Sequence, residues 1–123
     1  MAALTGHTIL AGQVRAMTSE TPFELATLRV TVVEIAGRSV CGLSVGDYFE
    51  VSQSSRITIP VGKHFCLYAL AAVTPLLPAK MRAFDENDWM AQDSLVACPD
   101  PDERLIMKIE RIGREQLLAS DLT

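Results

Sequence analysis

The sequence predicts an α+β domain in which a small, mostly antiparallel, curled sheet packs over one main helix. Two observations predict it: several short runs alternate apolar and polar residues or are rich in β-branched residues, and one stretch near the middle has helical spacing. The chain has 123 residues, of which 49% are hydrophobic, so we expect one domain with a packed core. The expected order of elements is β-β-(β)-α-β-β, arranged as a partial barrel.

Three segments of the first half are typical of strands. Residues 28–35 are rich in Val, Ile and Thr and carry apolar residues on both faces, which indicates a central strand. Residues 47–51 alternate in polarity and predict a second strand. Residues 56–59 also alternate and are followed by Pro60, which predicts a third, short strand.

The middle of the chain changes to helical spacing. We expect a helix over residues 64–74, a break or kink at Pro75, and a second helical turn over residues 78–83. The acidic residues 85–93 predict a loop, with Trp89 as its anchoring aromatic side chain.

The second half predicts a hairpin. Residues 94–98 indicate a short buried strand, the Pro-Asp-Pro-Asp segment at 99–102 indicates a turn, and residues 105–110 alternate more regularly than any other segment. The turn would place the strand at residues 94–98 beside the strand at residues 105–110.

We expect the domain to span residues 28–113, between an N-terminal arm at 1–27 and a C-terminal tail at 114–123. Within the arm, residues 7–14 suggest an extended piece and residues 21–24 suggest the start of a short helical turn. The tail is polar with scattered leucines and suggests a short helix.

The composition argues against several classes of protein. The formal net charge of −4 disfavours a nucleic-acid-binding protein, because binding to phosphates needs excess positive charge. Cys41, Cys66 and Cys98 are odd in number and widely spaced, which indicates a reducing cytoplasm rather than a disulfide framework. The longest apolar stretch, residues 65–79, contains two prolines and is shorter than the roughly 20 residues of a membrane span, so we expect no membrane association.

No cofactor and no metal are expected. Three Cys and two His in this spacing do not complete a structural zinc site, and the acidic residues 85–93 lack the spacing of an EF-hand. The glycine-rich motifs that bind phosphates or dinucleotides are absent from the sequence.

Four segments of the chain, in this order, resemble a family of small bacterial and archaeal proteins of largely uncharacterised function: residues 30–35, 46–51, 97–101 and 108–112. The Cys98-Pro99-Asp100-Pro101 segment is the most specific of them. The resemblance covers about residues 28–113 and implies a fold and a focus on Cys98, without implying a reaction.

The chain departs from this family pattern in three places. Ser39 stands where family members often carry a Cys, and Cys41 lies two residues further on. Ile59 precedes Pro60 where the family has a second Cys, and the N-terminal 27 residues are longer than usual. A metal or redox site built from those family cysteines would be incomplete here.

Three residues are candidates for catalysis. Cys98 could act as a nucleophile or thiol ligand, or fill a small space in the core. Asp100, held between two prolines, could act as a general base, or accept hydrogen bonds within the turn. His64, at the expected start of the helix, could act as an acid or base beside the Cys98 thiol, or be a capping or surface residue.

Four further side chains are candidates for ligand binding. Tyr48, Tyr68 and Trp89 have polar tips and could line a pocket between the sheet and the helix. Arg104 could bind an anionic group, although ion pairs with neighbouring acidic residues are the plainer interpretation.

Two functions are compatible with these features. The first is a small pathway protein that binds or transforms a small organic molecule, as a cofactor-free isomerase- or cyclase-like enzyme or as an accessory binder. The alternative is a non-catalytic interaction protein. Because the short chain is rich in apolar residues, we expect a homo-oligomer, most simply a dimer.

Overall fold

The computed structural model describes residues 20–123. Its elements, in chain order, are β1 (Phe23–Ile35), β2 (Tyr48–Ser52), β3 (Arg56–Thr58), α2 (Leu67–Val73), the 3₁₀ turn η1 (Thr74–Leu76), α3 (Leu77–Arg82), η2 (Trp89–Ala91), β4 (Ser94–Ala97), β5 (Leu105–Leu117) and η3 (Ala119–Asp121). The α+β class and the order β-β-β-α-β-β are therefore confirmed.

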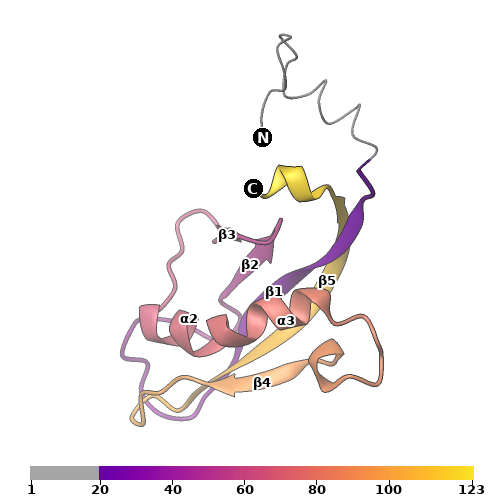
Figure 1. Ribbon diagram of the computed structural model, residues 1–123. Coiled ribbons are helices and arrows are strands. Elements are labelled where there is room, and N and C mark those ends of the chain that lie inside the picture. The colour runs from indigo at the N-terminus through magenta and orange to yellow at the C-terminus, as the bar shows by residue number, and fades with distance from the viewer. Residues whose placement is uncertain (1–19) are drawn as a thin grey trace.

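The five strands form one antiparallel sheet in the order β3-β2-β1-β5-β4. The sheet curls but does not close, because β3 and β4 lie at opposite edges and do not pair with each other. The expected partial barrel is thus an open, curved sheet (Figure 1).

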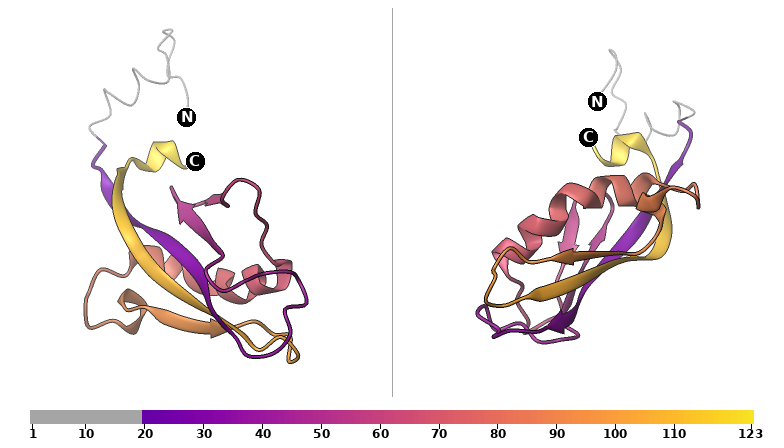
Figure 2. Two further views of the ribbon diagram at one scale, coloured as in Figure 1. Left: turned by 180° about the vertical axis from the view of Figure 1, so that it is seen from behind. Right: turned by 90° about the horizontal axis from the view of Figure 1, so that it is seen from below.

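The helices α2 and α3 run across one face of the sheet and make a second layer, which is clear in the right-hand view of Figure 2. Alternate residues of the central strands point into this interface, as period-2 geometry requires. Leu28 and Val30 of β1, and Met107 and Ile109 of β5, are all buried there. Burial of each such side chain contributes about 1.5–3 kcal/mol to the free energy of unfolding.

The opposite face of the sheet is not covered by helices and is more polar. Arg29 on β1 pairs with Glu50 on β2, with 2.6 Å between Nη2 and Oε2. Lys108 on β5 lies 3.4 Å from Asp93. The sheet therefore has one face covered by helices and one face with charged side chains, as is common for antiparallel sheets.

Strand β1 begins earlier than the sequence predicts. The expected helical turn over residues 21–24 is wrong, because Phe23 and the four residues after it pair with residues 113–117 of β5. The expected boundaries at 27/28 and 113/114 lie within this long strand pair. The extended piece expected at residues 7–14 lies outside the described residues.

The helical segment is less interrupted than expected. Helix α2 begins at Leu67, three residues later than predicted, and continues through η1 directly into α3. Pro75 lies in η1, so the chain passes the proline as a short 3₁₀ turn rather than as a break. Within residues 20–123, no helix is both long enough and apolar enough to cross a membrane.

The predicted hairpin is confirmed, since β4 pairs antiparallel with β5 through a turn at the predicted residues. Two details differ. β4 is the last strand of the sheet, so it is an edge strand rather than a buried one, and its Leu95, paired with Lys108, is 68% exposed. Trp89 is 63% exposed in η2, so it does not anchor the acidic loop.

Candidate functional site

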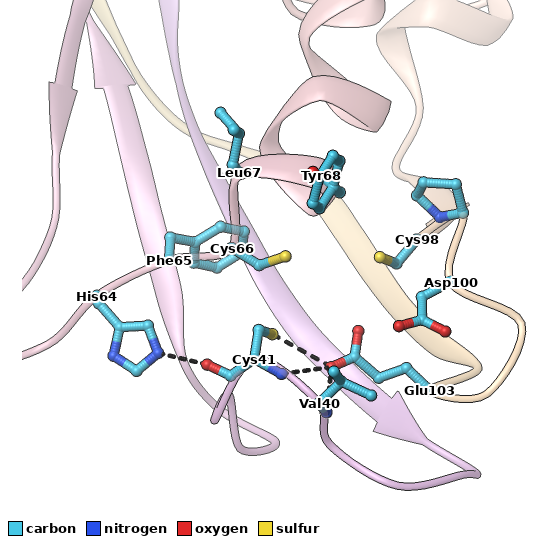
Figure 3. Close-up of a pocket in the computed structure, with 11 residues that line it drawn as sticks. Val40, Cys41, His64, Phe65, Cys66, Leu67, Tyr68, Cys98, Asp100 and Glu103 are labelled. Atoms are coloured by element: carbon cyan, nitrogen blue, oxygen red, sulfur yellow. Dashed lines mark hydrogen bonds between the residues drawn. The ribbon is translucent and has the colours of Figure 1, made fainter.

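Three loop segments border an open cavity of about 570 Å³ beside the start of α2. They are the loop after β1, the segment that leads into α2, and the turn between β4 and β5 (Figure 3). The walls are mostly apolar, and the lining residues are Val40, Cys41, His64, Phe65, Cys66, Leu67, Tyr68, Cys98, Pro99, Asp100 and Glu103.

The loop after β1 is fixed to the β4–β5 turn by the backbone. The N–H of Gly37 donates to the carbonyl of Glu103 at 3.0 Å, and the N–H of Arg38 donates to that of Asp102 at 3.1 Å. A Cβ at residue 37 would lie 1.9 Å from the Asp102 carbonyl oxygen. Only glycine therefore permits this close approach of the two loops.

The β4–β5 turn has its own internal bonds. The Asp102 N–H donates to Oδ1 of Asp100 at 2.9 Å, and the Cys98 N–H donates to the carbonyl of Leu105 at 2.9 Å. Arg104 adopts a left-handed backbone conformation with φ of 47°. This tight reversal turns the side chain of Glu103 inward, where it is only 1% exposed.

One carboxylate oxygen of Glu103, Oε2, accepts three hydrogen bonds from the loop after β1. The donors are the N–H of Val40 at 2.9 Å, the N–H of Cys41 at 3.3 Å and the thiol of Cys41 at 3.2 Å. Within residues 20–123, Glu103 makes no ion pair with Lys, Arg or His. The carboxylate is thus held by dipoles rather than by an opposite charge.

Glu103 remains ionised although its side chain is buried. Burial raises its pKa, but the hydrogen bonds from the thiol and N–H of Cys41, the N–H of Val40 and the thiol of Cys98 outweigh burial, and the pKa is lowered overall. The floor of the cavity therefore carries a negative charge at neutral pH.

The neighbouring thiols are neutral. Burial, together with the hydrogen bonds to Glu103 and Cys66, raises the pKa of Cys41 to about 12, although the Leu43 N–H acts in the opposite direction. Burial also raises the pKa of Cys98, again with contributions from Cys66 and Glu103. All three cysteines are free, and Figure 3 shows their sulfur atoms turned toward the same space.

His64 lies in the segment before α2 rather than at the start of the helix. Its Nε2–H donates to the carbonyl of Cys41 at 2.8 Å, so the ring ties this segment to the loop after β1 (Figure 3). Gly42 adopts φ of 81°, and a Cβ there would contact the imidazole at 3.5 Å. In the described part of the chain, no hydrogen bond joins His64 to Cys98.

The structure brings four of the seven predicted site residues to this cavity. Cys98, Asp100, His64 and Tyr68 line it together. Asp100 also makes the turn hydrogen bond that was the alternative interpretation of this residue.

The other three predicted residues lie elsewhere. Tyr48 is on the polar side of the sheet, where the guanidinium of Arg29 lies 4.7 Å from its ring centroid. Arg104 donates to the carbonyl of Ala36 at 3.2 Å, and Trp89 projects from η2. None of these side chains lines the cavity.

Three residues of the cavity with titratable side chains were not among the predicted site residues: Cys41, Cys66 and Glu103. Glu103 resembles an ordinary charged turn residue in the sequence, between Asp102 and Arg104. Cys41 lies two residues after Ser39, where the sequence resemblance leads us to expect a thiol.

No group of three or more His, Cys, Asp or Glu side chains among residues 20–123 is arranged to hold a metal ion. Comparison with protein-family models, curated proteins and solved structures gives no match for this chain.

Proposed function

We propose that the protein binds a small organic molecule in the cavity between the loop after β1, the start of α2 and the β4–β5 turn. The observation that carries this proposal is a cavity of about 570 Å³ with mostly apolar walls and one buried, ionised carboxylate at its floor. Apolar walls with a few fixed polar groups are the usual composition of small-molecule sites.

Binding is better supported than covalent catalysis. A nucleophilic cysteine needs a lowered pKa and a nearby base. Burial raises the pKa of both Cys41 and Cys98, and His64 donates its Nε2–H to a backbone carbonyl. Cofactor-free acid–base turnover would use the same site, with Glu103 as the ionised group, and the binding experiment below identifies the compounds on which to test it.

A fragment screen by ligand-observed NMR tests the binding proposal. Neutral, anionic and cationic fragments are compared on the wild type and on Val40→Trp, which places a large side chain at the rim of the cavity. Val40 contributes its backbone N–H to Glu103, so this bond survives the substitution. Val61→Trp is the matched control, because Val61 is fully exposed and outside the cavity lining.

The proposal predicts fragments that bind to the wild type and to Val61→Trp and that lose binding in Val40→Trp. A screen in which no fragment distinguishes the two variants contradicts it.

Self-association is a second candidate, favoured by a specific surface. Leu95, on the edge strand β4, is 68% exposed, and edge strands readily pair with other chains. We propose a homodimer formed through this edge. We also propose a reducing compartment such as the cytoplasm, where the three cysteines would stay free. Light scattering should give twice the chain mass, and Leu95→Lys should give the monomer mass; a monomeric wild type contradicts the proposal.

A further inference from the structure

The charges around the cavity indicate the kind of ligand it takes. Its lining includes the carboxylates of Asp100 and Glu103 but contains neither Lys nor Arg. His64, the remaining basic side chain, is turned toward the carbonyl of Cys41. An anionic ligand would therefore meet negative charge without a cation to compensate it.

One carboxylate oxygen of Glu103, Oε1, can accept further hydrogen bonds. The three bonds from Val40 and Cys41 all go to Oε2. Figure 3 shows the other oxygen turned toward the space bordered by Cys98 and Asp100. Burial of a carboxylate without a partner of opposite charge costs free energy. A cation placed beside this oxygen would therefore bind more favourably than a neutral hydrogen-bond donor.

The walls above this carboxylate are apolar and aromatic. Phe65 packs edge-on against Phe49 of the core, with ring centroids 4.8 Å apart, and so forms a rigid wall. Tyr68, in the first turn of α2, is 66% exposed at the rim. Aromatic rings attract cations as well as apolar groups.

Building on the proposed function, we infer that the ligand is a small apolar amine, whose ammonium group binds Glu103 and Asp100 while its hydrocarbon or aromatic part lies against Phe65 and Tyr68. The ammonium supplies the positive charge that this site lacks within the described chain. The side chains of Cys66 and Cys98 add soft, polarisable contacts.

A series of three probes of similar shape tests this inference on the wild type by isothermal titration or NMR at pH 7. The probes are 2-phenylethylamine, 2-phenylethanol and 3-phenylpropanoate, which are cationic, neutral and anionic. We expect the amine to bind about tenfold more tightly than the alcohol, because a charge-assisted hydrogen bond replaces a neutral one. The anion should bind most weakly.

Two variants assign the preference to Glu103. Glu103→Gln keeps the side-chain length and removes the charge, and should reduce the preference for amine over alcohol to less than about threefold. Glu34→Gln is the control, because Glu34 is an exposed residue of β1 outside the cavity, and it should leave the preference unchanged.

The outcomes separate this inference from the proposed function. If the alcohol or the anion binds as tightly as the amine, or if the amine fails to bind at about 10 mM, the amine assignment is wrong. Persistence of the amine preference in folded Glu103→Gln also overturns it. If no fragment of any charge class is sensitive to Val40→Trp, the cavity itself is not a binding site.

Discussion

Cys41 donates twice to the same carboxylate oxygen of Glu103, through its backbone N–H at 3.3 Å and through its thiol at 3.2 Å. The two residues are 62 positions apart in the sequence. Their contact joins the loop after β1 to the β4–β5 turn. It lowers the pKa of Glu103, and it adds to the effect of burial in raising the pKa of Cys41.

Replacement of this carboxylate should destabilise the fold. Glu103→Gln exchanges a charged acceptor for a neutral amide and turns an NH₂ group toward existing donors. We expect a loss of about 1.5–3 kcal/mol in the free energy of unfolding, measured by urea denaturation. Glu34→Gln, at an exposed position of β1, should change it by less than about 0.5 kcal/mol. Equal losses of stability in the two variants would contradict the stabilising role of Glu103.

The same group should give the fold a distinct sensitivity to acid. The pKa of Glu103 is lowered in the folded state from 4.5, so its ionisation stabilises the fold above about pH 4.5, and this contribution is lost as the pH falls through the lower folded value. The stability difference between the wild type and Glu103→Gln should therefore shrink as the pH is lowered from 7 to 3. A difference that stays constant over this range would show that the charge of Glu103 contributes nothing. Other carboxylates, such as Asp47, titrate in both proteins and cancel in the comparison.

The Cys41 thiol should be slow to alkylate in the folded protein. Its pKa is raised from 9.0 to about 12, which lowers the thiolate fraction at pH 8 about a thousandfold, and the thiolate is the reactive form. Mass spectrometry after iodoacetamide treatment, with peptide mapping, measures the rate at this residue. The same residue in urea-unfolded protein is the reference, and equal rates in the two states would contradict the raised pKa.

Much of the fold can be read from the sequence because local patterns determine it. The β-branched residues 28–35 and the alternating residues 105–110 do lie in the two central strands. The five residues before position 28 carry no such pattern. They are strand residues because β5 pairs with them, and this long-range pairing is invisible to local periodicity.

The docking of the two loops depends on the absence of a side chain at residue 37. Gly37→Ala would bring Cβ within 1.9 Å of a backbone oxygen, so the loops must separate and the bonds to Glu103 must lengthen. We expect a loss of at least about 2 kcal/mol in the free energy of unfolding. Gly113→Ala is the matched control, because nothing lies within 4 Å of a Cβ there, and it should be neutral or slightly stabilising. Similar losses in both variants would contradict this packing.

The site was less predictable than the fold. The Cys98-Pro99-Asp100-Pro101 segment has recognisable turn chemistry, which is why Cys98 and Asp100 could be chosen from the sequence. Glu103 could not, because its role depends on a left-handed conformation at Arg104 and on donors 62 and 63 residues away. Such contacts arise only when separate loops meet.

The ionisation of Glu103 can be observed directly by a ¹³C NMR titration of the glutamate side-chain carboxyl groups, with its resonance assigned by its loss in Glu103→Gln. We expect the resonance to report an ionised carboxylate at neutral pH and to titrate with a midpoint below 4.5. A midpoint above this ordinary value would mean that burial outweighs the hydrogen bonds from Val40 and Cys41. A midpoint above neutral pH would mean that the cavity floor is not the anionic site described above.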